Sequence, residues 1–464
     1  MTSFFELLFS RKVWCLLQKQ TNLYADQQIL TKPDHEWQKV SIGELKAWVG
    51  CLIAMGISKK PNLSMYWDST WKLPAVADRF TRDRFTKIKK YLHVADNKAN
   101  ADNKTSSSDR LRKIGPLVDA LLQNFQKQYQ PSTCLTLDED MCKSKGRNRM
   151  KQYMRAKIIK WGYRIWKLCD AKTAYVLNFD VYTGAEDGKV TKDLASSVAM
   201  RLTEDYQGKD RVVIMDNYFS SVPLFLDLLL TSTYACGTIR PRRKHLPESI
   251  REKKVRKQGD HEFWQSDNLV LTIWQDRKPV HLLSTCCEPS GPDTVPRKGS
   301  EGKAQDIPCP PSLKLYTQYM GGGVDRSDRM VRTYSTSRRS KKWWVRLFYY
   351  CLDTTLANSY ILYQQSPNYP QLTYLQYLEQ VALGLIGTPS LVKRVQQSGG
   401  KEKKAKRSHP RPVSSQRRQP GDGNAVTVPL VDAKDDRVRM SVKPAKFIFV
   451  LKSALSCIIR GVKN

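Results

Sequence analysis

Three aspartates, Asp138, Asp216 and Asp325, are the residues of this sequence best placed to do chemistry. Asp138 follows the alternating residues 135–137, and Asp216 ends the apolar residues 212–215. Asp325 follows three glycines at a predicted helix start. Mg²⁺ prefers oxygen ligands and usually takes only a few protein carboxylates. Two such ions ~4 Å apart can activate a water and stabilise the leaving oxygen of a phosphoryl transfer. We therefore predict a site for two Mg²⁺ ions, for which Mn²⁺ can substitute, although spacing alone does not single out this triple.

Asp216 also has a plainer interpretation, because aspartate often caps a turn. The β-branched residues before it favour a short buried strand. Ser220 and Ser221 then form a turn, and Pro223 opens an apolar run that predicts a helix. Ligands of open α/β sheets gather at the carboxyl ends of strands, where Asp216 would lie. Two other carboxylates in comparable settings favour a functional site over a simple cap.

The charge of the chain points to a polyanionic partner. Its 78 Lys and Arg outnumber 44 Asp and Glu, giving a formal net charge of +34. Such self-repulsion favours a nucleic acid as the partner, and the partner that we expect is double-stranded DNA. An RNA-binding or chromatin scaffold would fit the charge equally well but gives no reason for the three carboxylates. Some individual lysines are expected to be solvated surface residues that do not contact a nucleic acid. The predicted DNA contacts are Lys143, Lys145, Arg147, Arg149, Arg242, Arg243, Lys244, Arg338, Arg339, Lys341 and Lys342.

Several classes of site and location are not expected. The 11 cysteines include no Cys-x-x-Cys pair, so a structural zinc site has no support, and reduced thiols are expected. The sequence start does not resemble a signal peptide, and no apolar stretch is long enough to predict a membrane span. No membrane partner and no small-molecule cofactor are expected. The basic residues 399–412 resemble a nuclear-import patch, so we expect a nuclear protein.

Periodicity places the aspartates in a mixed α/β region between helical segments. Residues 1–94, 111–129 and 343–363 predict helices, and the polar residues 95–110 predict a linker. Strands are predicted at 157–160, 163–168, 175–182, 212–215, 234–239, 262–265, 269–274 and 280–284, and helices between them at 189–202 and 223–230.

Three blocks of sequence resemble the signature blocks of piggyBac transposases, in particular the vertebrate piggyBac transposable element-derived proteins. The blocks are LTLDEDMCKSKGR, VVIMDNYFSSVPLF and MGGGVDRSDRM, the last followed by SRRSKKWWVRLFYYCLDTTLANSYILY. They occur in family order, and the likeness covers roughly residues 1–370.

The resemblance implies an RNase H-like α/β catalytic domain, in which helices flank a mixed sheet, with a DDD active site. Its three catalytic, metal-binding carboxylates fall on Asp138, Asp216 and Asp325, and Asp328 is a candidate accessory residue. It also implies a homodimer that cleaves DNA and joins it at TTAA sites using Mg²⁺.

The same resemblance predicts the domain organisation. A helical dimerisation and DNA-binding domain is expected in two parts, with a catalytic domain in two parts and a basic insertion domain, while the composition alone predicts a disordered basic tail. The helical domain is expected at 1–130 and 336–395, and the catalytic domain at 131–240 and 301–335. The insertion domain is expected at 241–300 and the tail at 396–464.

One departure from the family pattern keeps a second function open. The family usually ends in a Cys- and His-rich zinc-binding domain, whereas the one cysteine after Cys351 is Cys457. The alternative to a transposase is therefore a domesticated or truncated derivative that binds DNA without transposing.

Overall fold

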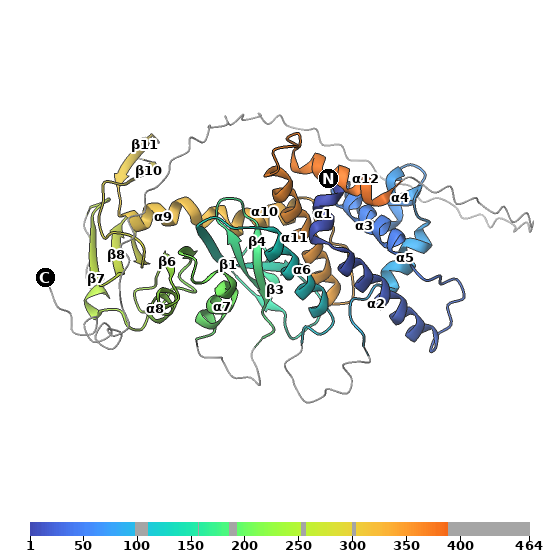
Figure 1. The fold of residues 1–464 in the computed structure, drawn as a ribbon, viewed down its shortest axis with the longest axis horizontal. Helices are drawn as coiled ribbons and strands as arrows, with labels where there is room; N and C mark the ends of the chain where they lie inside the picture. The colour runs from blue at the N-terminus through green and yellow to red at the C-terminus, as the bar shows by residue number, and fades with distance from the viewer. Residues whose placement is uncertain (98–109, 156, 185–192, 252–256, 299–302, 388–464) are drawn as a thin grey trace, which may run out of the picture. The chain divides into compact units, whose positions relative to one another are not determined.

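The computed structural model describes residues 1–97, 110–155, 157–184, 193–251, 257–298 and 303–387 (Figure 1). The predicted tail at 396–464 and most of the predicted linker at 95–110 lie outside these ranges.

The centre of the fold is a nine-stranded mixed sheet, in the order β2-β3-β1-β5-β6-β9-β8-β7 with β4 also paired to β3. The strands β1, β5 and β6 run parallel, and the other pairs are antiparallel. Their bounds are β1 Cys134–Lys143, β2 Gln152–Tyr153, β3 Trp161–Asp170, β4 Val176–Val181, β5 Arg211–Met215, β6 Thr233–Thr238, β7 His261–Ser266, β8 Leu269–Gln275 and β9 Pro279–Ser284. A separate two-stranded sheet joins β10 Thr294–Lys298 to β11 Ala304–Pro308. This is the predicted mixed α/β architecture.

Two segments of the sheet region bear on the sequence predictions. The predicted strand at 157–160 is wrong, because these residues connect β2 to β3. Ile158 in this connection is 91% exposed, so the apolar pair that suggested a strand does not pack into the core. The predicted insertion at 241–300 supplies β7, β8 and β9, and β9 pairs with β6, so these strands extend the main sheet.

Four helices that pack against the sheet are α7 Leu194–Thr203, α8 Val222–Leu230, α9 Pro311–Tyr319 and α10 Val324–Thr333, with 3₁₀ turns η2 Glu204–Tyr206, η3 Glu248–Arg251 and η4 Met320–Gly322. The helix α7 contacts β3 and β4, α8 contacts β6, α9 contacts β6 and β9, and α10 contacts β1 and β3. The start of α8 agrees with the sequence prediction, since the Ser221 hydroxyl accepts a hydrogen bond from Leu224 N at 3.4 Å and Pro223 lies in the first turn.

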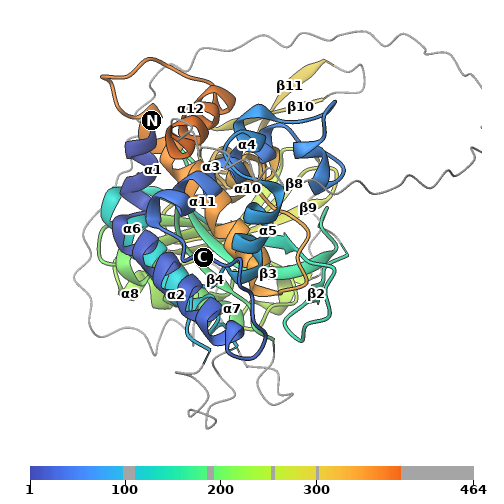
Figure 2. The same cartoon turned by 90° about the vertical axis from the view of Figure 1, so that its right-hand side faces the viewer.

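A helical region formed by both ends of the described chain packs beside the sheet (Figures 1 and 2). It contains α1 Thr2–Leu8, α2 Arg11–Ile29, α3 Ile42–Ile57, η1 Leu63–Trp67, α4 Pro74–Ala77, α5 Arg82–Tyr91, α6 Gly115–Gln128, α11 Trp344–Gln364 and α12 Tyr374–Ile386. The helix α11 is buried along almost its whole length, as its continuous apolar sequence predicts, and it contacts α1, α6, α10 and β1. Within the described ranges, no helix has both the length and the apolar character of a membrane span.

Candidate metal centre

The parallel pairing of β1 with β5 brings two of the predicted aspartates together. Leu137 lies opposite Met215 in this register, so Asp138 and Asp216 are the next residues on neighbouring strands. One carboxylate oxygen from each of Asp138, Glu139 and Asp216 can be chosen so that all three lie within 4.8 Å of one another. Three carboxylates this close repel one another, and a hard divalent cation relieves that repulsion.

Asp138 is the most deeply buried aspartate of this group, with 9% of its surface exposed. Burial raises the pKa of its carboxyl to about 7, and the negative charges of Glu139 and Asp216 act in the same direction. Lys157 opposes this shift, since its Nζ lies 3.9 Å from Asp138 Oδ1. The Glu139 backbone N–H also donates to Asp138 Oδ1 at 2.6 Å.

Asp216 caps a turn and belongs to the carboxylate group at the same time. Tyr218 N donates to its Oδ1 at 2.9 Å, and the Ser220 hydroxyl donates to its backbone oxygen at 2.9 Å. Burial nevertheless raises the pKa of Asp216, with a further contribution from Glu139. Asp216 therefore does cap the turn, and this role does not exclude a functional one.

Glu139 is the member of the group that the sequence analysis missed. Its side chain is 8% exposed, and its Oε1 lies 3.7 Å from Lys157 Nζ. The Arg164 guanidinium lies 3.5 Å from Glu139 Oε2. The run Asp138-Glu139-Asp140 was the available signal, because three consecutive acidic residues at a buried strand need specific partners.

Asp325 is exposed in the first turn of α10, and among the described residues it does not belong to the carboxylate group. The start of α10 does lie against β1. A Cβ built on Gly323 would be only 1.7 Å from Thr136 Oγ1, so no larger residue fits without movement. Asp325 as the third metal ligand stays a prediction.

Asp328 lies in a buried ion-pair network, outside the three-carboxylate group. Lys167 Nζ is 2.7 Å from Asp328 Oδ1 and 3.2 Å from Asp140 Oδ2. Arg332 pairs with both carboxylates, at 3.0 Å from Asp328 Oδ2. Lys167 is completely buried and stands opposite Asp138 in the β1–β3 register. The network therefore ties α10 to β1 and β3 directly beside the candidate metal centre.

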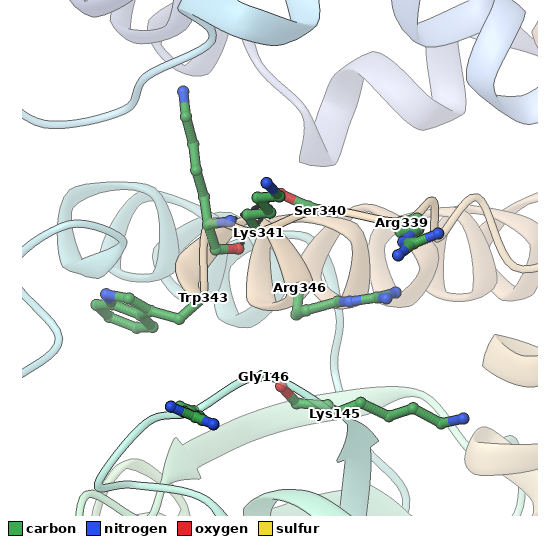
Figure 3. Close-up of a pocket in the computed structure, with 10 residues that line it drawn as sticks. Lys145, Gly146, Arg339, Ser340, Lys341, Trp343 and Arg346 are labelled. Atoms are coloured by element: carbon green, nitrogen blue, oxygen red, sulfur yellow. Dashed lines mark hydrogen bonds between the residues drawn. The ribbon is translucent and has the colours of Figure 1, made fainter.

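Two of the predicted basic clusters converge on one cavity of about 640 Å³ (Figure 3). One side comes from the connection after β1, and the other from the segment that leads into α11. Among the residues described around it, none is acidic. The lining consists of Ser144, Lys145, Gly146, Arg147, Arg339, Ser340, Lys341, Lys342, Trp343 and Arg346, of which Arg346 was not predicted.

The other predicted DNA contacts have varied environments. Lys143, Arg149, Arg242 and Lys244 are exposed. Arg338 lies over the ring of Tyr66, with its guanidinium carbon 5.9 Å from the ring centroid. The Arg243 guanidinium donates to the backbone oxygens of Asn217, at 3.1 Å, and Tyr218. Arg243 therefore supports the turn after Asp216, a role that a charge cluster in the sequence does not reveal.

The raised pKa of Asp138 predicts how the stability of the metal-free protein depends on pH. The folded-state pKa of about 7 exceeds the ordinary value of 3.8, so the stabilising contribution is full below 3.8 and is lost as pH rises through 7. Between pH 5.5 and 8 the expected loss is roughly 2 kcal/mol. Asp138→Asn should therefore raise the Tm of the protein in EDTA at pH 8 and change it much less at pH 5.5.

Thermal unfolding of both proteins at the two pH values checks this prediction. Mn²⁺ should raise the Tm of the wild type more at pH 8 than at pH 5.5, because protons compete for the carboxylates. An equal effect of Asp138→Asn at both pH values would show that Asp138 does not titrate in this range.

Comparison with known proteins identifies a family. The sequence matches the family described as Transposase IS4 over residues 2–360. It is 29% identical to human PiggyBac transposable element-derived protein 2 over 398 residues, 82% of this chain and 64% of that protein. It is 29% identical to human PiggyBac transposable element-derived protein 3 over 403 residues, 83% of this chain and 65% of that protein. The chain thus spans just under two thirds of the length of these two relatives.

A solved structure has the same fold. It is the cryo-EM structure of a piggyBac transposase synaptic complex with hairpin DNA, which matches with a TM-score of 0.72 and 24% sequence identity. The match covers 83% of this chain and 80% of the other. The predicted RNase H-like fold, with a mixed sheet flanked by helices, is thereby confirmed.

Proposed function

Because this chain belongs to the Transposase IS4 family, we propose that it cleaves and joins DNA strands by metal-dependent phosphoryl transfer. The observation that carries this proposal is the group formed by Asp138, Glu139 and Asp216 where the parallel pairing of β1 with β5 ends. Three carboxylates with oxygens within 4.8 Å of one another suit hard divalent cations.

The chain's own residues have separate roles in this proposal. Asp138, Glu139 and Asp216 would hold the cations, and Asp325 is our proposed further ligand from the first turn of α10. Bound Mg²⁺ or Mn²⁺ supplies a Lewis acid that polarises a phosphate oxygen and activates a water. Lys157, within 4 Å of two of the carboxylates, offsets part of their charge before a cation binds.

Double-stranded DNA is the proposed substrate. The cavity lined by Lys145, Arg147, Arg339 and Lys341 presents cations from two segments, and none of the described residues that line it is acidic. Such a surface binds phosphates by counterion release. The similar solved structure is a transposase complex with hairpin DNA. A TTAA target and a homodimer belong to the same proposal and rest on the family resemblance, whereas a nuclear location rests on the basic residues 399–412.

A DNA-binding protein without strand-transfer activity is the second candidate. The observation in its favour is that Asp325 is not among the grouped carboxylates. In this case the basic cavity would bind DNA, whereas the metal centre would lack one of its ligands.

Nicking of a supercoiled plasmid by the purified chain tests the choice between these functions. The transposase proposal expects nicked product with Mg²⁺ or Mn²⁺ and none with EDTA, because the carboxylates need the cation to stabilise the reacting phosphate. Plasmid binding without nicking in either metal would overturn strand cleavage and leave the DNA-binding function.

A further inference from the structure

The short hairpin formed by β2 and β3 displays two half-exposed aromatic side chains. Tyr153 is 51% exposed and Trp161 is 50% exposed. They are cross-strand partners with ring centroids 4.7 Å apart, and Lys151 Nζ lies 4.9 Å from the Trp161 centroid. These contacts hold the rings in place, yet half of their surface still faces solvent at the edge of the sheet.

The stretch of sequence that contains this aromatic pair carries charge of one sign. Residues 141–165 contain nine Lys and Arg and no Asp or Glu. Nearby cations repel one another, and exposed aromatic surface is unfavourably hydrated. A polyanion that also carries flat apolar groups would relieve both the repulsion between the cations and the unfavourable hydration of the aromatic rings. A nucleic acid with unpaired bases has this chemistry, whereas a duplex keeps the faces of its bases stacked inside.

The same hairpin reaches the candidate metal centre. Its connecting residues include Lys157, whose Nζ donates to the backbone oxygen of Glu139 at 2.9 Å. Lys157 also lies 3.9 Å from Asp138 Oδ1 and 3.7 Å from Glu139 Oε1. A strand held at the carboxylates would therefore have this hairpin beside it.

We propose that Tyr153 and Trp161 form a stacking platform for unpaired bases of a single DNA strand that runs from this hairpin past Lys157 toward the metal centre. This inference rests on the proposed function, since that function makes DNA the ligand, and it adds that part of the bound DNA is single-stranded. Lys151 and the neighbouring cations hold the phosphates of the same strand.

The test compares binding of a labelled oligo(dT) strand and a labelled duplex of equal length, by fluorescence anisotropy in EDTA. Stacking contributes enough per base that Trp161→Leu should weaken oligo(dT) binding about ten-fold. Duplex affinity should stay unchanged. Trp161→Phe keeps an aromatic face and should bind oligo(dT) almost as the wild type does. Lys151→Gln should weaken both ligands, because it removes a phosphate contact.

Trp71→Leu is the matched control. Trp71 is 57% exposed and has Lys60 Nζ 5.8 Å from its ring centroid, so it has similar chemistry away from the hairpin. This variant should bind both ligands as the wild type does. The proposal is overturned if Trp161→Leu leaves oligo(dT) affinity unchanged or weakens both DNAs equally, or if Trp161→Phe binds as poorly as Trp161→Leu.

Binding in EDTA separates this proposal from the proposed function. A chain that binds oligo(dT) through Trp161 but never nicks DNA with metal would overturn strand cleavage alone. A chain that nicks DNA with metal but shows no Trp161 effect would overturn the stacking platform alone.

Discussion

Asp216→Asn is expected to lower metal-dependent DNA nicking by two to three orders of magnitude. Asp216 directly follows β5 and lies next to Asp138, and removing its charge leaves the cations with one carboxylate fewer. The metal ions supply several kcal/mol of transition-state stabilisation, and each ~1.4 kcal/mol is ten-fold in rate. The fold should persist, because an asparagine Oδ1 can still accept the hydrogen bond from Tyr218 N.

Initial rates of plasmid nicking in Mn²⁺, with duplex affinity measured in EDTA, check this expectation. Duplex affinity should not fall, since a negative charge near the phosphates has been removed. Asp227→Asn is the matched control, because Asp227 is exposed in α8, the helix that follows the same turn. If Asp216→Asn nicks DNA as fast as Asp227→Asn, then Asp216 is a turn cap only.

Lys167→Met is expected to lower the free energy of unfolding by about 3–5 kcal/mol. Lys167 has no exposed surface and lies within 3.2 Å of both Asp140 and Asp328. Without it, two buried carboxylates share the single guanidinium of Arg332. An unpaired buried charge is far less stable than a buried pair, so the loss should exceed that of an ordinary core substitution.

Urea denaturation of three variants measures this effect. Lys167→Met/Asp328→Asn removes one charge of each sign, so it should be 1–3 kcal/mol more stable than the sum of the single variants predicts. Lys172→Met changes an exposed lysine just after β3 and should stay within about 0.5 kcal/mol of the wild type. A Lys167→Met variant as stable as Lys172→Met would contradict the network.

The proximity of Asp138 to Asp216 could be predicted from the sequence. Both follow short apolar runs, and polar residues just beyond buried parallel strands meet at one edge of a sheet. The helix start at Pro223 and the buried helix α11 were predicted for similarly local reasons, a cap and a continuous apolar run.

Other parts of the site depend on contacts between distant segments. Glu139 joins the carboxylate group because β1 continues past the end of β5, which no local pattern reveals. Lys167 looks like a solvent-facing lysine in its strand, and only Asp140 and Asp328 explain its burial. Arg243 belonged to a basic cluster in the sequence, yet its partners are backbone oxygens of another turn.

Two kinds of force position the start of α10 beside the candidate metal centre. One is the steric contact of Gly323 with Thr136, and the other is the attraction between charges. The gap between α10 and β1 is limited there by hard contact between atoms, since even one added carbon would lie 1.7 Å from Thr136 Oγ1. Steric repulsion is steep and independent of ionic strength, whereas the attraction between charges weakens with screening. The network of Lys167, Asp140 and Asp328 is buried, so salt screens its attraction only weakly. The start of α10, which carries Asp325, should therefore keep its place against β1 over a wide range of ionic strength.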